Sequence, residues 1–278
     1  MTQGGADSAP SPVAALFDAV ADEYDQTGID FFEPIAEGLV AELDPRAGES
    51  CVDLGCGRGA VTLGLAERVL PGGSVVGLDL SSGMLAHARE LVAARGLDVD
   101  LRLGDAAEPA LPKGAADVVA SSLVLFFLPD PAAALARWVE LLRPGGRIGL
   151  ATFGEEDPVW EAVDKELGPW VPPMMRDPRV VGPDSPFSSD EGMERLLAGA
   201  GAVDVRTAGF RLQVRFGDVA GWQRFSRATG QRAVWARIPP EEVSGVVSRA
   251  GAHLESARDE DGKVVVWQDI RYTVGVAP

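Results

Sequence analysis

The sequence predicts an α/β fold in which helices alternate with the strands of a mostly parallel sheet. Three observations lead to this prediction. Short apolar runs end in an acidic or polar residue at Asp53, Asp79, Asp105 and Ser121. Helical patterns separate these runs, an alternation typical of parallel sheets covered by helices. The run that begins at Cys51 breaks into alternate glycines, as a strand does when it turns tightly into a helix.

Composition limits the class of protein and its partners. The 278 residues are 46% hydrophobic, enough for one large core, and the net charge is −17. No basic cluster is present, so we do not expect a nucleic-acid partner. A disulfide between Cys51 and Cys56 would cross the glycine turn, so we expect two reduced thiols and no metal site. Without a long apolar run or a signal peptide, the sequence predicts a cytoplasmic protein with no membrane partner, and it does not indicate an oligomeric state.

The N-terminal region is expected to consist of a tail and two helices. Residues 1–12 are small and polar, and we expect a disordered tail. From Val13 to Tyr24, apolar residues recur at helical spacing. A second helix is expected over Ile35–Leu43, ending near Pro45.

The glycine turn after the first strand is typical of a nucleotide-type cofactor site. Gly55, Gly57 and Gly59 allow positive φ and a close approach of the backbone to a ligand. Gly55, Gly57 and Ala60 also match the dinucleotide pattern, which leaves an NAD-type cofactor open. The acidic Asp53 before the turn instead favours a cationic ligand such as S-adenosylmethionine (SAM).

Further strands are expected at residues 74–79, 99–105 and 117–122. A helix is expected to end at residues 144–146, and a fifth strand should follow it to Thr152. The carboxyl ends of these strands should meet at one edge of the sheet, where open α/β sheets bind ligands. An acid in the position of Asp79 can accept hydrogen bonds from both ribose hydroxyls of either cofactor.

Five motifs resemble those of the class I SAM-dependent methyltransferases, in particular the small-molecule group related to the ubiquinone and menaquinone C-methyltransferases. The motifs lie at residues 52–59, 77–85, 104–106, 123–130 and 142–146. The resemblance covers roughly residues 13–153. It implies a Rossmann-like sheet of seven strands, mostly parallel with an antiparallel last strand, and a helical lid.

The resemblance also implies SAM as cofactor, S-adenosylhomocysteine (SAH) as product, and a role for each motif. The glycine turn would wrap the methionine part, Asp79 would bind the ribose, and Met84 would pack on the adenine. The cofactor-binding set is Asp53, Gly55, Cys56, Gly57, Gly59, Asp79, Leu80, Met84, Asp105, Ala106 and Ser121.

We expect one methyltransferase domain over residues 13–278. It would comprise N-terminal cap helices at 13–45, a SAM-binding core at 46–153, and lid or substrate segments at 154–187 and 217–260. The expected elements beyond the core are a helix at 159–167, an irregular proline-rich stretch at 168–190, a helix at 190–200, a strand at 203–216, helices at 219–228 and 240–254, and a strand at 263–276.

The resemblance implies a histidine base after the fourth strand, but this chain has Phe126 and Phe127 in that segment. Tyr24 and Glu155 are the remaining candidates for a catalytic role near the transferred methyl group. Methyl transfer can depend largely on orientation, with a base only where the acceptor needs one.

Aromatic residues are dense outside the predicted core, which favours a hydrophobic or aromatic small-molecule acceptor. They are Trp160, Trp170, Phe187, Trp222, Phe225 and Trp235. Without an obvious base, the acceptor atom would be a nucleophilic carbon or an acidic hydroxyl, and the resemblance leans towards carbon. The composition looks like that of a GC-rich bacterial source, so we expect a natural-product tailoring step. A SAM-binding enzyme that does not methylate, such as a cyclase, and an NAD-dependent oxidoreductase remain alternatives.

Overall fold

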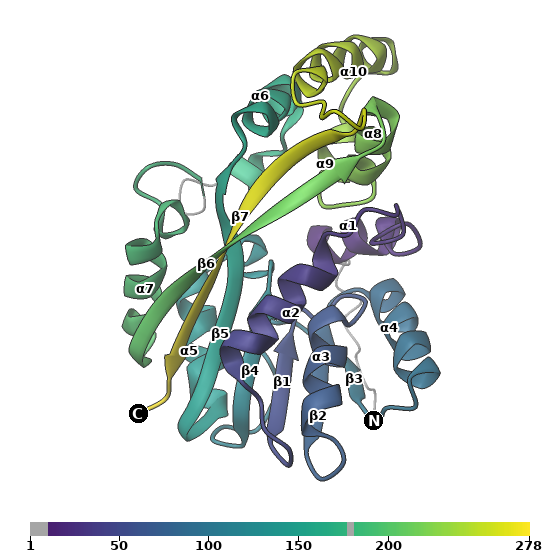
Figure 1. Ribbon diagram of the computed structural model, residues 1–278. Helices are drawn as coiled ribbons and strands as arrows, with labels where there is room; N and C mark the ends of the chain where they lie inside the picture. The colour runs from purple at the N-terminus through teal and green to yellow at the C-terminus, as the bar shows by residue number, and fades with distance from the viewer. Residues whose placement is uncertain (1–10, 177–180) are drawn as a thin grey trace, which may run out of the picture.

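The computed structural model describes residues 11–176 and 181–278, and its centre is a sheet of seven strands. The strand order is β3-β2-β1-β4-β5-β7-β6. Strands β1 to β5 pair in parallel, whereas β7 is antiparallel to both β5 and β6 (Figure 1). The strands are β1 Ser50–Leu54, β2 Ser74–Asp79, β3 Asp100–Leu103, β4 Ala116–Ser122, β5 Leu142–Glu156, β6 Val203–Phe216 and β7 Val264–Val276. This topology confirms the predicted fold class.

Helices cover both faces of the sheet. They are α1 Pro12–Val20, α2 Phe32–Leu43, α3 Ala60–Val69, α4 Ser82–Ala94, α5 Pro131–Leu141, α6 Pro158–Leu167, α7 Asp190–Gly199, α8 Val219–Arg227, α9 Arg232–Trp235 and α10 Pro240–Glu255. Helices α2 and α3 share one buried cluster with the sheet, and α5 and α7 share a second cluster on the opposite face. The strand ends between these layers are therefore held rigidly at one edge.

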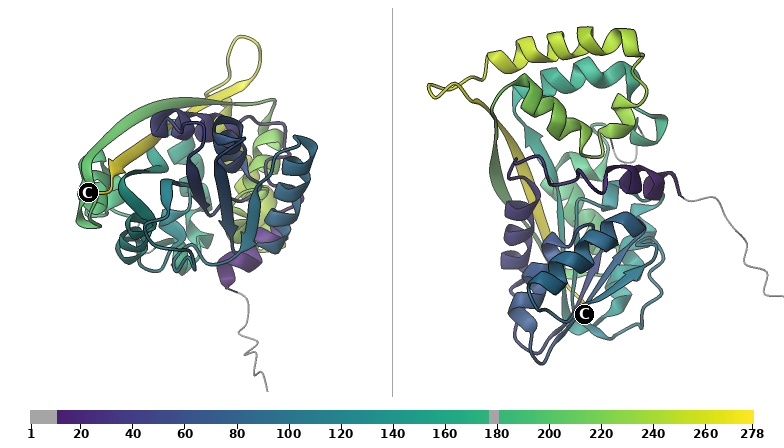
Figure 2. Two further views of the ribbon diagram at one scale, coloured as in Figure 1. Left: turned by 90° about the horizontal axis from the view of Figure 1, so that it is seen from below. Right: turned by 90° about the vertical axis from the view of Figure 1, so that its right-hand side faces the viewer.

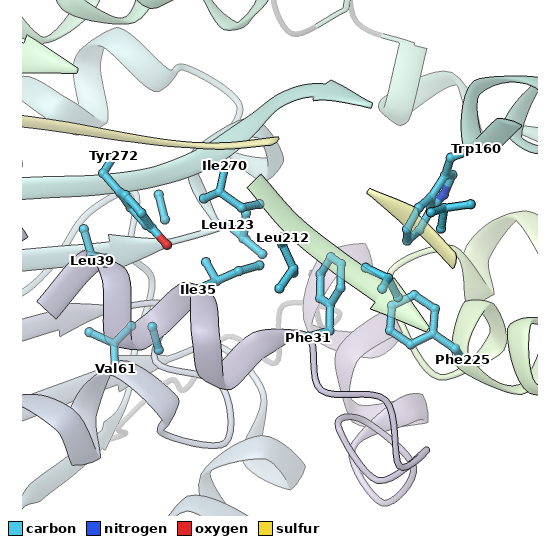
Figure 3. Close-up of a cluster of buried hydrophobic side chains, with 14 of the residues drawn as sticks. Phe31, Ile35, Leu39, Val61, Leu123, Trp160, Leu212, Phe225, Ile270 and Tyr272 are labelled. Carbon is cyan, nitrogen blue, oxygen red and sulfur yellow. The ribbon is translucent and has the colours of Figure 1, made fainter. Parts of the chain in front are cut away.

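The lid is built on an extension of three strands. Strands β5, β7 and β6 continue beyond the parallel core, and α6, α8, α9 and α10 gather at their far end (Figures 1 and 2). Figure 3 shows how buried side chains join this lid to α2, with Phe31 lying between Ile35 of α2 and Phe225 of α8. The lid and α2 thus share one apolar core.

Three sequence-based boundaries were wrong. Helix α1 ends at Val20, so Tyr24 lies in the turn that follows it. Helix α5 ends at Leu141, and residues 144–146 lie inside β5 instead of ending the helix. Strand β5 runs on to Glu156, because β7 supplies hydrogen-bonding partners as far as Gln268.

Helix α1 begins at Pro12, inside the range that was expected to be a disordered tail. Residues 1–10 lie outside the described residues, but Ser11 already caps α1 by accepting from the Val13 N–H. The lid contains one helix, α9, that the sequence analysis did not predict. Within the described ranges, no helix is both long enough and apolar enough to span a bilayer.

Candidate functional site

The glycine turn between β1 and α3 is tied to the neighbouring strand and leaves its backbone open on one side. The N–H groups of Gly55 and Cys56 both donate to the Leu78 carbonyl, at 2.8 and 2.9 Å. Gly55 has φ +75°, and a Cβ there would overlap the side chain of Val124. Gly57 has φ +52°, and a Cβ there would meet no atom within 4 Å. The turn therefore requires glycine at its base and presents free space at Gly57.

Asp79 joins this turn to the start of α4. Its carboxylate accepts from the N–H groups of Gly57 and Ser81, each at 2.8 Å. Burial raises the pKa of Asp79 despite these bonds, which favour the charged form. A carboxylate has about four acceptor positions, so it retains capacity for two hydroxyl groups.

Asp53 lies beneath the turn with almost no exposure. It is 1% exposed and accepts from the Thr62 hydroxyl at 2.6 Å. Burial raises its pKa to about 7, and the nearby charge of Asp79 acts in the same direction. A cation placed above the turn would stabilise the charged form of both acids.

The residues predicted to contact the adenine are anchored by the core. Met84 is buried and packs with Val20 of α1 and with Ala21, which follows that helix. Leu80 is half-buried. The Ala106 carbonyl accepts from Nε1 of the buried Trp138 at 2.7 Å. This bond fixes the backbone whose N–H would face a ligand.

Two further polar residues of the predicted set form hydrogen bonds with backbone groups. The exposed Asp105 accepts from the Ala107 N–H at 2.8 Å. The Ser121 hydroxyl donates to the Leu54 carbonyl at 2.7 Å and so ties β4 to β1. The next residue, Ser122, lines the cleft described below.

A cleft of about 470 Å³ opens in front of the glycine turn. Its walls are the turn itself, residues between 24 and 36 of the N-terminal region, and residues of α3 and α4. It is lined by the predicted residues Tyr24, Asp53, Gly55, Cys56 and Gly57, but it does not extend to Asp79, Leu80, Met84, Asp105 or Ala106. The hydrogen bond between Gly57 and Asp79 connects the predicted residues that line the cleft with those that lie outside it. We therefore define the candidate site by the residues at the strand ends, and not by the cleft alone.

Two residues that the sequence analysis missed hold the N-terminal region against this site. Arg58 Nη1 donates to the carbonyls of Ala21 and Tyr24, both at 2.9 Å. Asp18 accepts from the Ser81 hydroxyl at 2.6 Å. The one sequence signal for Arg58 is its position inside the glycine turn. No local pattern identifies its partners, because they lie more than 30 residues away in the chain.

The two candidate catalytic residues are not brought together. Tyr24 lies in the cleft and stacks on Phe32 with ring centroids 4.5 Å apart. Burial, with the charges of Asp25 and Asp79, holds its pKa far above the usual range, so its phenol stays protonated. Glu155 is an exposed residue of β5 and does not line the cleft.

Aromatic rings form a wall next to the strand ends. Phe126 stacks on Phe153 at 5.5 Å, and Phe127 meets Phe17 of α1 edge-on at 5.3 Å. Phe153 remains 36% exposed, and Phe187 lies edge-on to Phe126 at 6.3 Å. Of the aromatic residues that the sequence singled out, four are buried and pack the lid: Trp160, Trp222, Phe225 and Trp235. Trp170 and Phe187 are half-buried.

The described part of the chain holds no group of three or more histidine, cysteine or acidic side chains arranged to bind a metal ion. Cys51 and Cys56 are both buried free thiols. The site therefore consists of backbone groups, carboxylates and aromatic rings, which suit an organic cofactor with ribose hydroxyls and a positive charge.

Comparison with known proteins gives relatives over the whole chain. A family model described as a methyltransferase domain matches residues 52–150. The chain is 35% identical over 273 residues to nocamycin O-methyltransferase of Saccharothrix syringae, which covers 94% of this chain and 96% of that protein. It is 38% identical over 162 residues to aklanonic acid methyltransferase of Streptomyces sp. (strain C5). That match covers 58% of this chain and 70% of the relative.

The fold also matches solved structures. Phosphoethanolamine N-methyltransferase 2 of Haemonchus contortus, in complex with SAM, superposes with a TM-score of 0.59 at 19% identity. The match covers 94% of this chain and 57% of that one. At this identity the likeness shows a shared fold.

Proposed function

Since this chain belongs to the class I SAM-dependent methyltransferases that act on small molecules, we propose that it methylates an acidic oxygen atom of a hydrophobic metabolite. The acceptor would be a carboxylate or an enolate, which carries its negative charge at neutral pH without help from the enzyme. The observation that carries this proposal is the aromatic wall beside the strand ends, next to a cleft whose described lining contains no histidine.

The strand-end residues support a definite placement of SAM, which supplies an electrophilic methyl group when bound. Asp79 would accept both ribose hydroxyls with the acceptor capacity that Gly57 and Ser81 leave free. The glycine turn would hold the methionine part, and Asp105 and the Ala106 N–H would bind the adenine. The buried acids near the turn would favour the positive charge of the sulfonium.

The described cleft lining contains no histidine, and its buried acids Asp25 and Asp53 are the groups that would favour the charge of the sulfonium. Tyr24 holds its proton because of burial. Among the described residues, the two histidines bond elsewhere: His87 contacts Asp22 at 2.8 Å and His253 contacts Glu166 at 3.3 Å. An acceptor that ionises by itself needs only orientation, which Tyr24 and the aromatic wall would give.

The names of the relatives favour oxygen over carbon as the acceptor atom. The relative that matches 94% of this chain is named an O-methyltransferase, and another relative is named for an acid. The motifs alone leaned towards carbon. We therefore favour oxygen, and we keep a natural-product tailoring step as the setting.

A panel of acceptors with trideuteromethyl SAM tests the proposal. The panel should contain hydrophobic carboxylic acids, acidic enols, neutral phenols and electron-rich alkenes of similar size. We expect SAH formation with the first two classes, and mass spectrometry and NMR should place the label on oxygen. The rate should follow the ionised fraction of the acceptor as pH rises.

Label on carbon, or turnover of the neutral phenols alone, would contradict the proposed acceptor. Tight SAM binding with no SAH from any class would favour the non-methylating alternative.

A further inference from the structure

Arg58 links the glycine turn to the C-terminal end of α1. Its Nη1 donates to the carbonyls of Ala21 and Tyr24, both at 2.9 Å. These carbonyls follow the last residue of the helix, Val20, where intrahelical N–H partners run out. A cation at a helix C-terminus also interacts favourably with the helix dipole. Arg58 therefore caps α1 from within the cofactor turn.

A second anchor holds α1 from the other side of the cofactor site. Asp18 Oδ1 accepts from the Ser81 hydroxyl at 2.6 Å and from the Gly83 N–H at 3.0 Å, at the N-terminus of α4. A Cβ on Gly83 would lie 2.9 Å from the Ala21 Cβ, so this close approach requires glycine. The two anchors flank Asp79, which bonds to both Gly57 and Ser81.

The same N-terminal segment, residues 12–30, contacts the aromatic wall and the lid. Phe17 meets Phe127 edge-on at 5.3 Å, and Tyr24 lines the cleft. Glu23 lies 3.5 Å from Arg232 of α9. The segment therefore covers the cofactor turn on one side and contacts the acceptor side on the other.

We propose that Arg58 is a positioning residue that keeps residues 12–30 closed over the bound cofactor, so that the product leaves only when this segment opens. Release of SAH then depends on breaking the two carbonyl contacts of Arg58. This inference rests on the membership of the family and not on the proposed acceptor. Its test uses SAH alone, so its failure is distinguishable from failure of the proposed function.

The test compares SAH dissociation and hydrogen exchange in the wild type and Arg58→Ala. Two lost hydrogen bonds should accelerate SAH dissociation roughly tenfold or more in stopped-flow fluorescence. Amides of residues 20–26 should lose protection with SAH bound, while the melting temperature changes little. Arg58→Lys, which keeps a donor and the charge, should recover part of the slow dissociation. Arg68→Ala is the matched control, because that exposed arginine also donates to a carbonyl, of Gly64 at 3.2 Å, but neither residue lines the cleft.

Variants at the second anchor distinguish positioning from a local effect on the turn. Asp18→Ala and Gly83→Ala should also accelerate SAH release, since both loosen α1 without touching Arg58. Combined with Arg58→Ala, Asp18→Ala should add little, because one segment is already open. Multiplicative rates would mean that Arg58 acts only on the glycine turn and would overturn the proposal. Unchanged SAH release in Arg58→Ala would also overturn the proposal. If Arg58→Ala does not fold, unchanged SAH release in Gly83→Ala would overturn it instead.

Discussion

Replacement of Asp79 by Asn tests the placement of the ribose and hence the whole cofactor site. The carboxylate accepts from two backbone N–H groups at 2.8 Å and has free capacity for two hydroxyls. Asparagine keeps the shape but has one acceptor oxygen, and its NH2 group would face one of those N–H donors. Hydrogen bonds to a charged group contribute about 1.5–3 kcal/mol, so SAM affinity should fall roughly 10- to 150-fold.

Calorimetric titration with SAM and SAH measures this loss, and thermal melts show whether the variant remains folded. Asp100→Asn is the matched control, since Asp100 is exposed on β3 and pairs with Arg102. It should bind SAM as the wild type does. An Asp79→Asn protein that is folded and retains full SAM affinity would refute the placement of the ribose and every assignment built on it.

Three further predictions concern the turn, the lid and the aromatic wall. Gly55→Ala should lower both the melting temperature and SAM affinity, because the added Cβ would overlap the side chain of Val124. A melting temperature equal to that of the wild type would show that the turn adapts. Burial raises the pKa of Asp164 to about 6, so the folded state binds more protons than the unfolded state between about pH 4 and 6, and stability should fall as pH rises through this window. Melts from pH 4 to 7 should show this slope. Asp164→Asn, which can still accept from Gln231, should make it shallower, whereas identical slopes in the two proteins would rule Asp164 out as a cause. Phe126→Ala should raise the acceptor KM about tenfold, the scale of one lost aromatic contact, and leave SAM affinity unchanged. Equal losses of acceptor and SAM affinity would make Phe126 a core residue.

Local sequence signals were sufficient for the sheet and for the position of its acidic residues near one edge. Asp53 and Asp79 belong to short apolar strands, and the position of an acid in a parallel strand determines which edge it reaches. The glycines of the turn are equally local, because a positive φ and a missing Cβ are properties of single positions.

Contacts that depend on tertiary packing could not be predicted in this way. Arg58 bonds to carbonyls 34 and 37 residues earlier in the chain, and no periodicity encodes such a pairing.

The end of β5 also depends on tertiary packing. A register shift between Phe153 and Glu156 leaves Glu155 exposed and places Glu156 opposite Gln268. Glu156, which the sequence could not distinguish from its neighbour, has its pKa raised to about 7 by burial and by Asp164.

The buried acids near the cleft explain why a cationic cofactor suits this fold. Among the described residues, no cation lowers the pKa of Asp53, and burial raises that pKa to about 7. Asp25 also lines the cleft, and there burial outweighs the charge of Arg58 and raises the pKa to about 6. Each ionised acid therefore destabilises the protein without ligand as pH rises through these values. A bound sulfonium would favour ionisation, so SAM should stabilise the protein more than neutral SAH does, by a margin that grows from pH 6 to pH 8. Equal stabilisation by SAM and SAH at both pH values would mean that these acids serve the fold and not the charge of the cofactor.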